Sequence, residues 1–181
     1  HEDLYNKLLE IKTNVAANYK CPQALHIKPS IAILKFMQIE MLEEKLVQNI
    51  KQTVASINPF MITLNGFGSL PTHTLFIKVN SSDCLTELTK QLKSIQSVLQ
   101  YSKDVKPHFI TEPHIIIAKK LLHWQYEQAW KQFNQQNYTA KCLVNKLVLL
   151  KKQVALGYDT ITEIPMCNTL IKPAIQTTLF T

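Results

Sequence analysis

The chain has 181 residues, a hydrophobic fraction of 46% and a formal net charge of +7. These values predict one soluble globular domain. No run of about 18 apolar residues occurs, which excludes a membrane-spanning helix, so we expect a cytoplasmic protein without a membrane partner.

The cysteines and the basic residues limit the kinds of binding site that the chain can form. The four cysteines are far apart and form no Cys-x-x-Cys pair, so we expect neither a metal site, nor a redox pair, nor a cofactor. All 20 basic residues are lysine, which excludes a bidentate guanidinium clamp on phosphate. A phosphate site would therefore use lysine, hydroxyl, histidine or backbone N–H groups. A general bias toward lysine, with no bearing on phosphate, explains the charge equally well.

Four elements are predicted in the first half of the chain. Apolar residues at helical spacing predict helices over 3–19 and 40–57, the second ended by Asn58-Pro59. A β-branched run predicts a strand over 24–36. Residues 60–67 and 74–79 predict a hairpin with its turn at 66–71.

The second half repeats this order. A helix with a leucine stripe over 85–99 is opened by the N-cap cluster Ser81-Ser82-Asp83. The following segments are a loop at 100–112, a strand at 114–119, a helix at 124–134 and a hairpin of 138–151 with 154–164. This repetition predicts an α+β fold with two lobes, approximate two-fold symmetry, two antiparallel sheets and a groove between the lobes. We expect residues 1–166 to form this bilobal domain and residues 167–181 to form a tail of unassigned role.

Two short motifs occupy equivalent places in the two halves. Residues 28–33 read Lys-Pro-Ser-Ile-Ala-Ile and residues 112–117 read Glu-Pro-His-Ile-Ile-Ile. Because side chains alternate along a strand, Ser30 and Ala32 share one face of the first strand, and His114 and Ile116 share one face of the second. Both strands are expected to line one site.

This layout resembles the 2H phosphoesterase superfamily, and within it the bacterial 2′-5′ RNA ligase, or cyclic phosphodiesterase-like, branch. The matching stretches cover about residues 4–166, and they are Pro59-Phe60 with Gly66-Phe67-Gly68, residues 71–79, residues 113–118 and residues 147–151. The resemblance implies two His-x-Thr/Ser motifs that face one phosphate. One histidine serves as general base and the other as general acid, while the hydroxyls donate to phosphate oxygens.

The sequence departs from that pattern at three of four positions. Ser30 stands where the first histidine is expected, and Ala32 and Ile116 replace the two hydroxyl residues. Only His114 is kept. The resemblance therefore implies an impaired catalyst.

Three functions remain open. The first is a degenerate family member that binds nucleotide or RNA phosphate. The second is a residual phosphodiesterase or RNA ligase that uses His114. The third is a protein-interaction scaffold, which the apolar Ile116 favours. Lys28 has the same parity as Ser30, and His108 lies in the loop before the second motif, so both are further candidates to line the groove.

Overall fold

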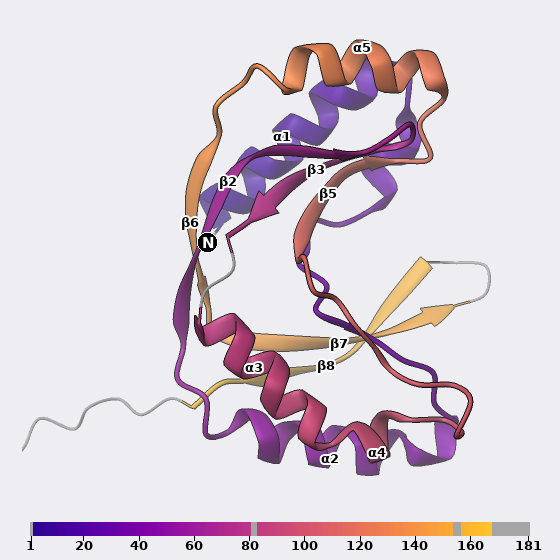
Figure 1. The fold of residues 1–181 in the computed structure, drawn as a ribbon, viewed down its shortest axis with the longest axis vertical. Helices are drawn as coiled ribbons and strands as arrows, with labels where there is room; N and C mark the ends of the chain where they lie inside the picture. Colours follow the sequence, from indigo (N-terminus) through magenta and orange to yellow (C-terminus); the bar gives the residue numbers. More distant parts are fainter. Residues whose placement is uncertain (1, 81–82, 154–156, 168–181) are drawn as a thin grey trace, which may run out of the picture.

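The computed structural model describes residues 2–80, 83–153 and 157–167 (Figure 1). The predicted cap at Ser81-Ser82, the start of the last predicted strand at Val154 and the tail from residue 168 lie outside these residues. The elements are α1 (Glu2–Asn18), the 3₁₀ helix η1 (Pro22–His26), β1 (Leu34–Lys35), the 3₁₀ helix η2 (Glu40–Leu42), α2 (Glu43–Val54), β2 (Phe60–Leu70), β3 (Thr74–Val79), α3 (Asp83–Ser94), α4 (Gln96–Leu99), β4 (His108–Phe109), β5 (His114–Lys119), α5 (His123–Phe133), β6 (Thr139–Val144), β7 (Lys146–Gln153) and β8 (Gly157–Pro165).

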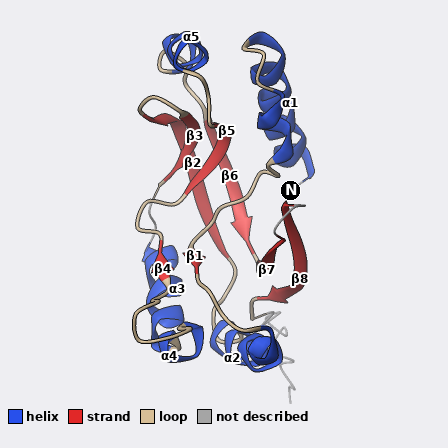
Figure 2. Cartoon of the chain, turned by 90° about the vertical axis from the view of Figure 1, so that its right-hand side faces the viewer, coloured by secondary structure: helices blue, strands red, loops and turns tan. Residues whose placement is uncertain are grey.

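The predicted α+β class with antiparallel sheets is confirmed. One sheet has four strands in the order β5-β3-β2-β6, and two further sheets pair β1 with β4 and β7 with β8. In Figure 1, α1 and α5 lie at the end that holds the four-stranded sheet, while α2, α3 and α4 lie at the other end beside β7 and β8. Figure 2 shows β1 and β4 between these two ends. No helix within the described ranges is both long and apolar enough to cross a lipid bilayer.

The helices form where the apolar spacing predicts them. In α2 the buried residues are Leu46, Ile50 and Val54, which recur every four positions and so lie on one side of the helix. In α3 the buried residues Leu85, Leu88 and Leu92 are spaced by three and then four positions, and they too lie on one side of the helix. The predicted leucine stripe continues to Leu99, but the helix is interrupted at Ile95, so that α4 is a separate short segment.

The four-stranded sheet curls because β2 is irregular at its middle. The pairing of β2 with β3 shifts between Leu64 and Phe67, and Gly66 in the shift has a φ of +71°. A side chain at this φ would be strained, so glycine is favoured there. A bulge bends the strand and increases its twist.

The first predicted motif strand is much shorter than expected. Residues 22–26 form η1 instead, since Pro22 starts a helical turn readily, and only Leu34–Lys35 pair as a regular strand. Between them, Ile31 makes an isolated bridge. Pro29 has no N–H to donate, which limits further pairing.

Three other predicted boundaries are wrong. The segment 138–151 is not one arm of a hairpin, because it divides at Asn145 into β6, which joins β2, and β7, which pairs with β8. The predicted turn at 66–71 is mostly strand, since β2 continues to Leu70. The predicted loop at 100–112 contains the short strand β4. Pairing with a distant strand decided the first and third of these structures, whereas the second reflects a tighter hairpin of β2 with the neighbouring β3.

Candidate functional site

The two motifs lie side by side, whereas the sequence predicted one motif in each lobe on either side of a groove. Ile31 and Ile115 form an antiparallel bridge, and the N–H of Ile110 donates to the carbonyl of Ile33 at 2.9 Å. Antiparallel pairing at this bridge puts Ser30 across from Ile116 and Ala32 across from His114. The four positions therefore belong to one surface.

Strand β3 adds two more side chains from the other side of β5. Lys78 is the direct partner of His114, and Phe76 is the direct partner of Ile116. Directly opposed residues in antiparallel strands project from the same face of a sheet. Six side chains thus form two rows across three chain segments, which we call the motif face: Lys78, His114 and Ala32 in one row, and Phe76, Ile116 and Ser30 in the other.

The motif face is accessible, whereas the residues between its members are buried. Ser30, Ala32 and Lys78 are exposed, and His114, Ile116 and Phe76 are half-buried. The alternate residues Ile77, Ile115 and Ile117 are at most 4% exposed and belong to the core. The alternation predicted from the two motifs is therefore present.

His114 is held in a defined orientation. Its Nδ1 lies 2.8 Å from the carbonyl oxygen of Glu112. A carbonyl can only accept, so Nδ1 carries a hydrogen and Nε2 of the neutral ring has the free lone pair. The imidazole also stacks on Phe76, with ring centroids 4.5 Å apart and an angle of 39° between the planes. These contacts leave Nε2 as the ring atom available to a ligand.

The other motif positions supply little chemistry. The Ser30 hydroxyl is 3.4 Å from the carbonyl of Lys28, a long contact within its own segment. Ala32 and Ile116 have no polar side-chain atoms. Of the six side chains, His114 alone is of a type that exchanges protons near neutral pH. The motif face can therefore attract an anion through the Lys78 ammonium, whereas the neutral His114 ring offers Nε2 as an acceptor, and it holds a single histidine.

The two further candidates from the sequence, Lys28 and His108, lie at the margin of the motif face or beyond it. Lys28 is exposed and precedes Ser30 by two residues. His108 is exposed in β4, where it pairs with Lys35, three residues beyond Ala32. Three residues of extended chain span about 10 Å, so the structure does not bring His108 together with His114.

A buried lysine supports the second motif from behind. Lys12 of α1 is fully buried, and its ammonium donates to the carbonyls of Ile117 at 2.8 Å and Ile116 at 3.2 Å. The pairing of β5 with β3 shifts at this point and skips Ile117. Burial lowers the pKa of Lys12 to about 8, with repulsion from Lys119 adding to this effect and Cys21 opposing it. Lys12 thereby satisfies carbonyls on the outer strand of the sheet.

Sequence reasoning missed Phe76, Lys78 and Lys12. The alternation in residues 74–79 does place Phe76 and Lys78 on one face, but only the pairing of β3 with β5 shows that this face continues into the motifs. Lys12 lies between Leu8 and Val15, on the buried side of α1. That position among apolar residues was a usable signal for burial.

Gly68 permits the position of the Phe76 ring. A Cβ atom at residue 68 would lie 2.4 Å from Cε2 and 2.6 Å from Cζ of that ring. We expect Gly68→Ala to push the ring away from His114 and to lower stability by about 1–3 kcal/mol. The measurement is the NMR chemical shift of the His114 ring protons. In the wild type the aromatic ring of Phe76 changes this shift. Unchanged shifts would contradict this account. Gly66→Ala serves as a comparison for the ring-proton shifts alone, because nothing lies within 4 Å of its Cβ position, while its φ of +71° makes that variant strained in its own right.

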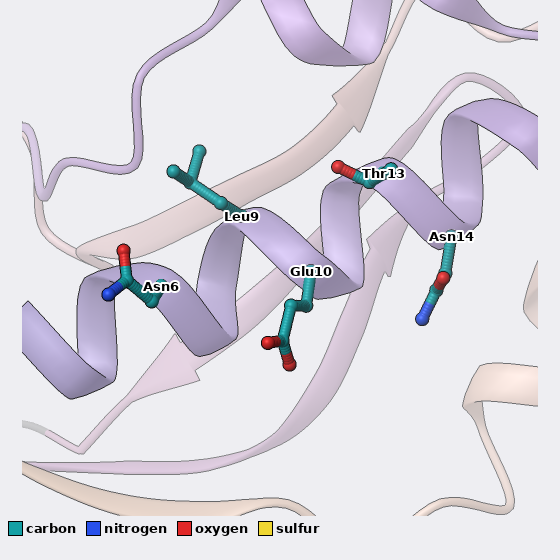
Figure 3. A pocket seen from close by; sticks show the side chains of 5 residues that line it. All are labelled: Asn6, Leu9, Glu10, Thr13 and Asn14. Atoms are coloured by element: carbon teal, nitrogen blue, oxygen red, sulfur yellow. The ribbon is translucent and has the colours of Figure 1, made fainter.

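Among the described residues, hollows lie beside α1, away from the motif face. A hollow of about 530 Å³ is lined by five residues of α1 alone, and Figure 3 shows these side chains along the helix. A smaller cavity of about 180 Å³ lies between α1 and residues 132–136. Neither lining includes a residue of the motif face. Within the described ranges, no group of three or more His, Cys, Asp or Glu residues could hold a metal ion.

Comparison with known families gives a match over most of the chain. The family model described as the 2′-5′ RNA ligase superfamily matches residues 4–155. This match includes every residue of the motif face. A comparison with curated proteins gave no match.

Proposed function

Since the chain belongs to the 2′-5′ RNA ligase superfamily, we propose that it binds nucleotide or RNA phosphate on the motif face without the catalytic power of a two-histidine site. The observation that carries this proposal is the composition of the paired motifs. Ala32 lies across from His114, and Ser30 lies across from Ile116. A phosphate held there would meet one imidazole and one ammonium.

The chemistry of the family reaction supports the loss of catalysis. Displacement at a phosphodiester needs one group to take a proton from the attacking oxygen and another to give a proton to the leaving oxygen. A missing acid or base costs about 10²–10⁴ in rate, and a missing oxyanion donor costs about 10²–10³. Binding makes a weaker demand, because a cation such as the Lys78 ammonium can hold an anion without any proton transfer.

A net charge of +7 favours the same ligands. Excess positive charge raises the local concentration of phosphate-bearing molecules and speeds their association. Cys21, Cys84 and Cys142 are free thiols, which supports a location in the reducing cytoplasm, where nucleotides and RNA are abundant.

A residual phosphodiesterase or RNA ligase is the second candidate. The observation that favours it is the contact of His114 Nδ1 with the carbonyl of Glu112, because it leaves Nε2 of the neutral ring ready to accept a proton. In this case His114 would act as general base, with solvent as the proton donor.

An apolar interaction surface around Ile116 and Phe76 is the remaining alternative.

Binding and turnover of a 2′,3′-cyclic nucleotide separate these functions. We expect amide NMR shifts at residues 30–32 and 114–116 on addition of the ligand, and loss of these shifts in His114→Ala. We expect hydrolysis of the cyclic nucleotide and cleavage of a 2′-5′-linked dinucleotide to remain at the level of that variant. His73→Ala is the matched control, since His73 is exposed between β2 and β3.

Each result has a distinct meaning. Turnover that disappears only in His114→Ala would establish the residual enzyme and overturn the binding-only role. Absence of both turnover and His114-dependent shifts would reject a phosphate site and leave the interaction surface.

A further inference from the structure

We infer that the surface at the start of α5 binds an anionic phospholipid bilayer. This surface, which we call the junction patch, combines basic and apolar side chains from three chain segments: Lys20 after α1, Leu70 at the end of β2, and Lys119, Lys120, Leu122 and Trp124 where β5 joins α5. None of these residues belongs to the motif face, so the inference is separate from the proposed function.

Hydrogen bonds hold the three segments together. Gln125 of α5 is 3% exposed, and its Nε2 donates to the carbonyl of Lys20 at 2.9 Å while its Oε1 accepts from the N–H of Leu122 at 2.9 Å. The N–H of Leu121 donates to the carbonyl of His73, in the turn between β2 and β3, at 3.0 Å. Figure 1 shows this turn beside the connection from β5 to α5. The junction patch is therefore one fixed surface.

Three residues of the junction patch are unfavourable for the local structure that they occupy. Lys20 and Lys120 have φ angles of 51° and 56°, in the left-handed region where glycine or asparagine is favoured. Leu122 is the N-cap of α5, a position that favours a polar side chain, and it makes no side-chain cap hydrogen bond. Residues that break local rules are expected where a function needs their side chains. We therefore expect these three side chains to take part in binding.

The junction patch has an excess of positive charge. The segments 18–26, 69–74 and 119–126 contain three lysines and neither aspartate nor glutamate. On the next turn of α5, the carboxylate of Glu127 lies 3.6 Å from the imidazole of His123. No lysine of the patch makes an ion pair within the described part of the chain. Each lysine close to an anionic lipid surface strengthens binding about fivefold, so these charges suit a negative bilayer.

The exposed apolar side chains favour a bilayer over a nucleic acid. Leu122 is 60% exposed, Leu70 46% and Trp124 43%. A base can stack on tryptophan, but a leucine offers it no aromatic face. At a bilayer, tryptophan lies at the level of the headgroups, leucine enters the boundary with the acyl chains, and lysine extends its ammonium to the headgroups. The residue types of the junction patch match this boundary between charge and hydrocarbon.

Binding at the bilayer surface requires no helix that spans it. The sequence led us to expect no membrane partner because the chain lacks a long apolar run, and that argument concerns crossing alone. A few apolar side chains together with lysines give weak and reversible attachment. We therefore expect an attachment that depends on the charge of the lipid and on salt.

Cosedimentation of the full chain with lipid vesicles tests the inference. We expect binding to vesicles of phosphatidylcholine with one third phosphatidylserine, and at least tenfold weaker binding to phosphatidylcholine alone. Binding should fall as salt is raised from about 0.1 M to about 1 M, because the Debye length falls from about 10 Å to about 3 Å. Tryptophan emission should shift to shorter wavelength on binding, and Trp124→Ser should remove this shift.

Two variants remove binding groups while they improve the local structure. Lys120→Asn suits the left-handed backbone and Leu122→Ser supplies an N-cap oxygen, so neither should lower the melting temperature. Lys120→Asn should weaken vesicle binding about fivefold, and Leu122→Ser about threefold or more. The matched controls are Lys152→Asn and Leu150→Ser, exposed on β7 at the other end of the molecule, and each should change binding less than twofold.

Each result supports or overturns the inference. Charge-dependent binding that Lys120→Asn and Leu122→Ser weaken, and that the controls leave unchanged, supports it. Absence of vesicle binding, equal binding to both kinds of vesicle, or equal weakening by the controls overturns it. If a single-stranded oligoribonucleotide binds through Lys120 and Trp124 while vesicles do not bind, the junction patch is a nucleic-acid surface and the inference is wrong. The proposed function is tested separately, by His114→Ala.

Discussion

Restoring three side chains, by Ser30→His, Ala32→Thr and Ile116→Thr together, is expected to give this chain turnover of 2′,3′-cyclic nucleotides. The bridge between Ile31 and Ile115 places these positions around His114. Residues 30 and 32 are exposed and residue 116 is half-buried, so the new side chains can be accommodated. The triple variant would have a histidine and a threonine on each of two adjacent segments.

The expected gain is large. A second acid–base group contributes about 10²–10⁴ in rate, so the hydrolysis rate of the triple variant should exceed the wild-type rate by at least about 100-fold. The measurement is steady-state hydrolysis, with circular dichroism and a thermal melt to confirm folding. His114→Ala in the triple background should remove the gain, and Ser30→His alone should give less than the full effect because the contributions are coupled.

A folded triple variant with no activity would contradict the view that the motif face is an altered catalytic site. The family relationship would then describe the fold alone. The binding experiments on His114→Ala would still decide whether the surface takes phosphate, because they do not depend on catalysis.

Replacing Lys12 by methionine is expected to lower the free energy of unfolding by about 2 kcal/mol at pH 7. Methionine fills a similar volume, but it cannot donate to the carbonyls of Ile116 and Ile117. Each buried carbonyl left without a donor costs about 1–3 kcal/mol. Removal of a buried charge offsets part of this cost. Urea unfolding measures the difference, and Lys7→Met on the exposed side of α1 is the control.

The cost of Lys12→Met should increase with pH. In the folded protein burial lowers the pKa of Lys12 to about 8 from 10.5. Between these values the unfolded chain binds more protons than the folded one, so the unfolding free energy of the wild type rises with pH. The neutral amine still donates to a carbonyl. The difference between wild type and variant should therefore grow by roughly 2 kcal/mol between pH 7 and pH 10.

Equal stability of wild type and Lys12→Met at both pH values would show that the contacts with β5 are unimportant. A constant difference across the pH range would leave the hydrogen bonds in place but exclude the buried charge as a source of pH dependence. In Lys7→Met, stability should follow the wild-type pH profile, since Lys7 is exposed.

The sequence by itself determined the elements whose pattern is local. Helices α1, α2, α3 and α5 and the β2–β3 hairpin were predictable because their apolar residues recur with the period of one element. The alternation within each motif was equally local, so the common face of Ser30 and Ala32, and that of His114 and Ile116, could be predicted. The sequence also shows without a structure that residue 30 is serine and that residues 32 and 116, alanine and isoleucine, carry no hydroxyl.

Only the tertiary structure decided which segments meet. The division at Asn145, the burial of Lys12 and the place of Lys78 opposite His114 all depend on pairing between residues far apart in sequence. A one-residue change in strand pairing would move every side chain to the other face, and nothing local to residues 74–79 determines that pairing. The sequence thus indicated which side chains the two motifs carry, whereas the pairing of β3, β5 and the first motif determined which groups surround His114.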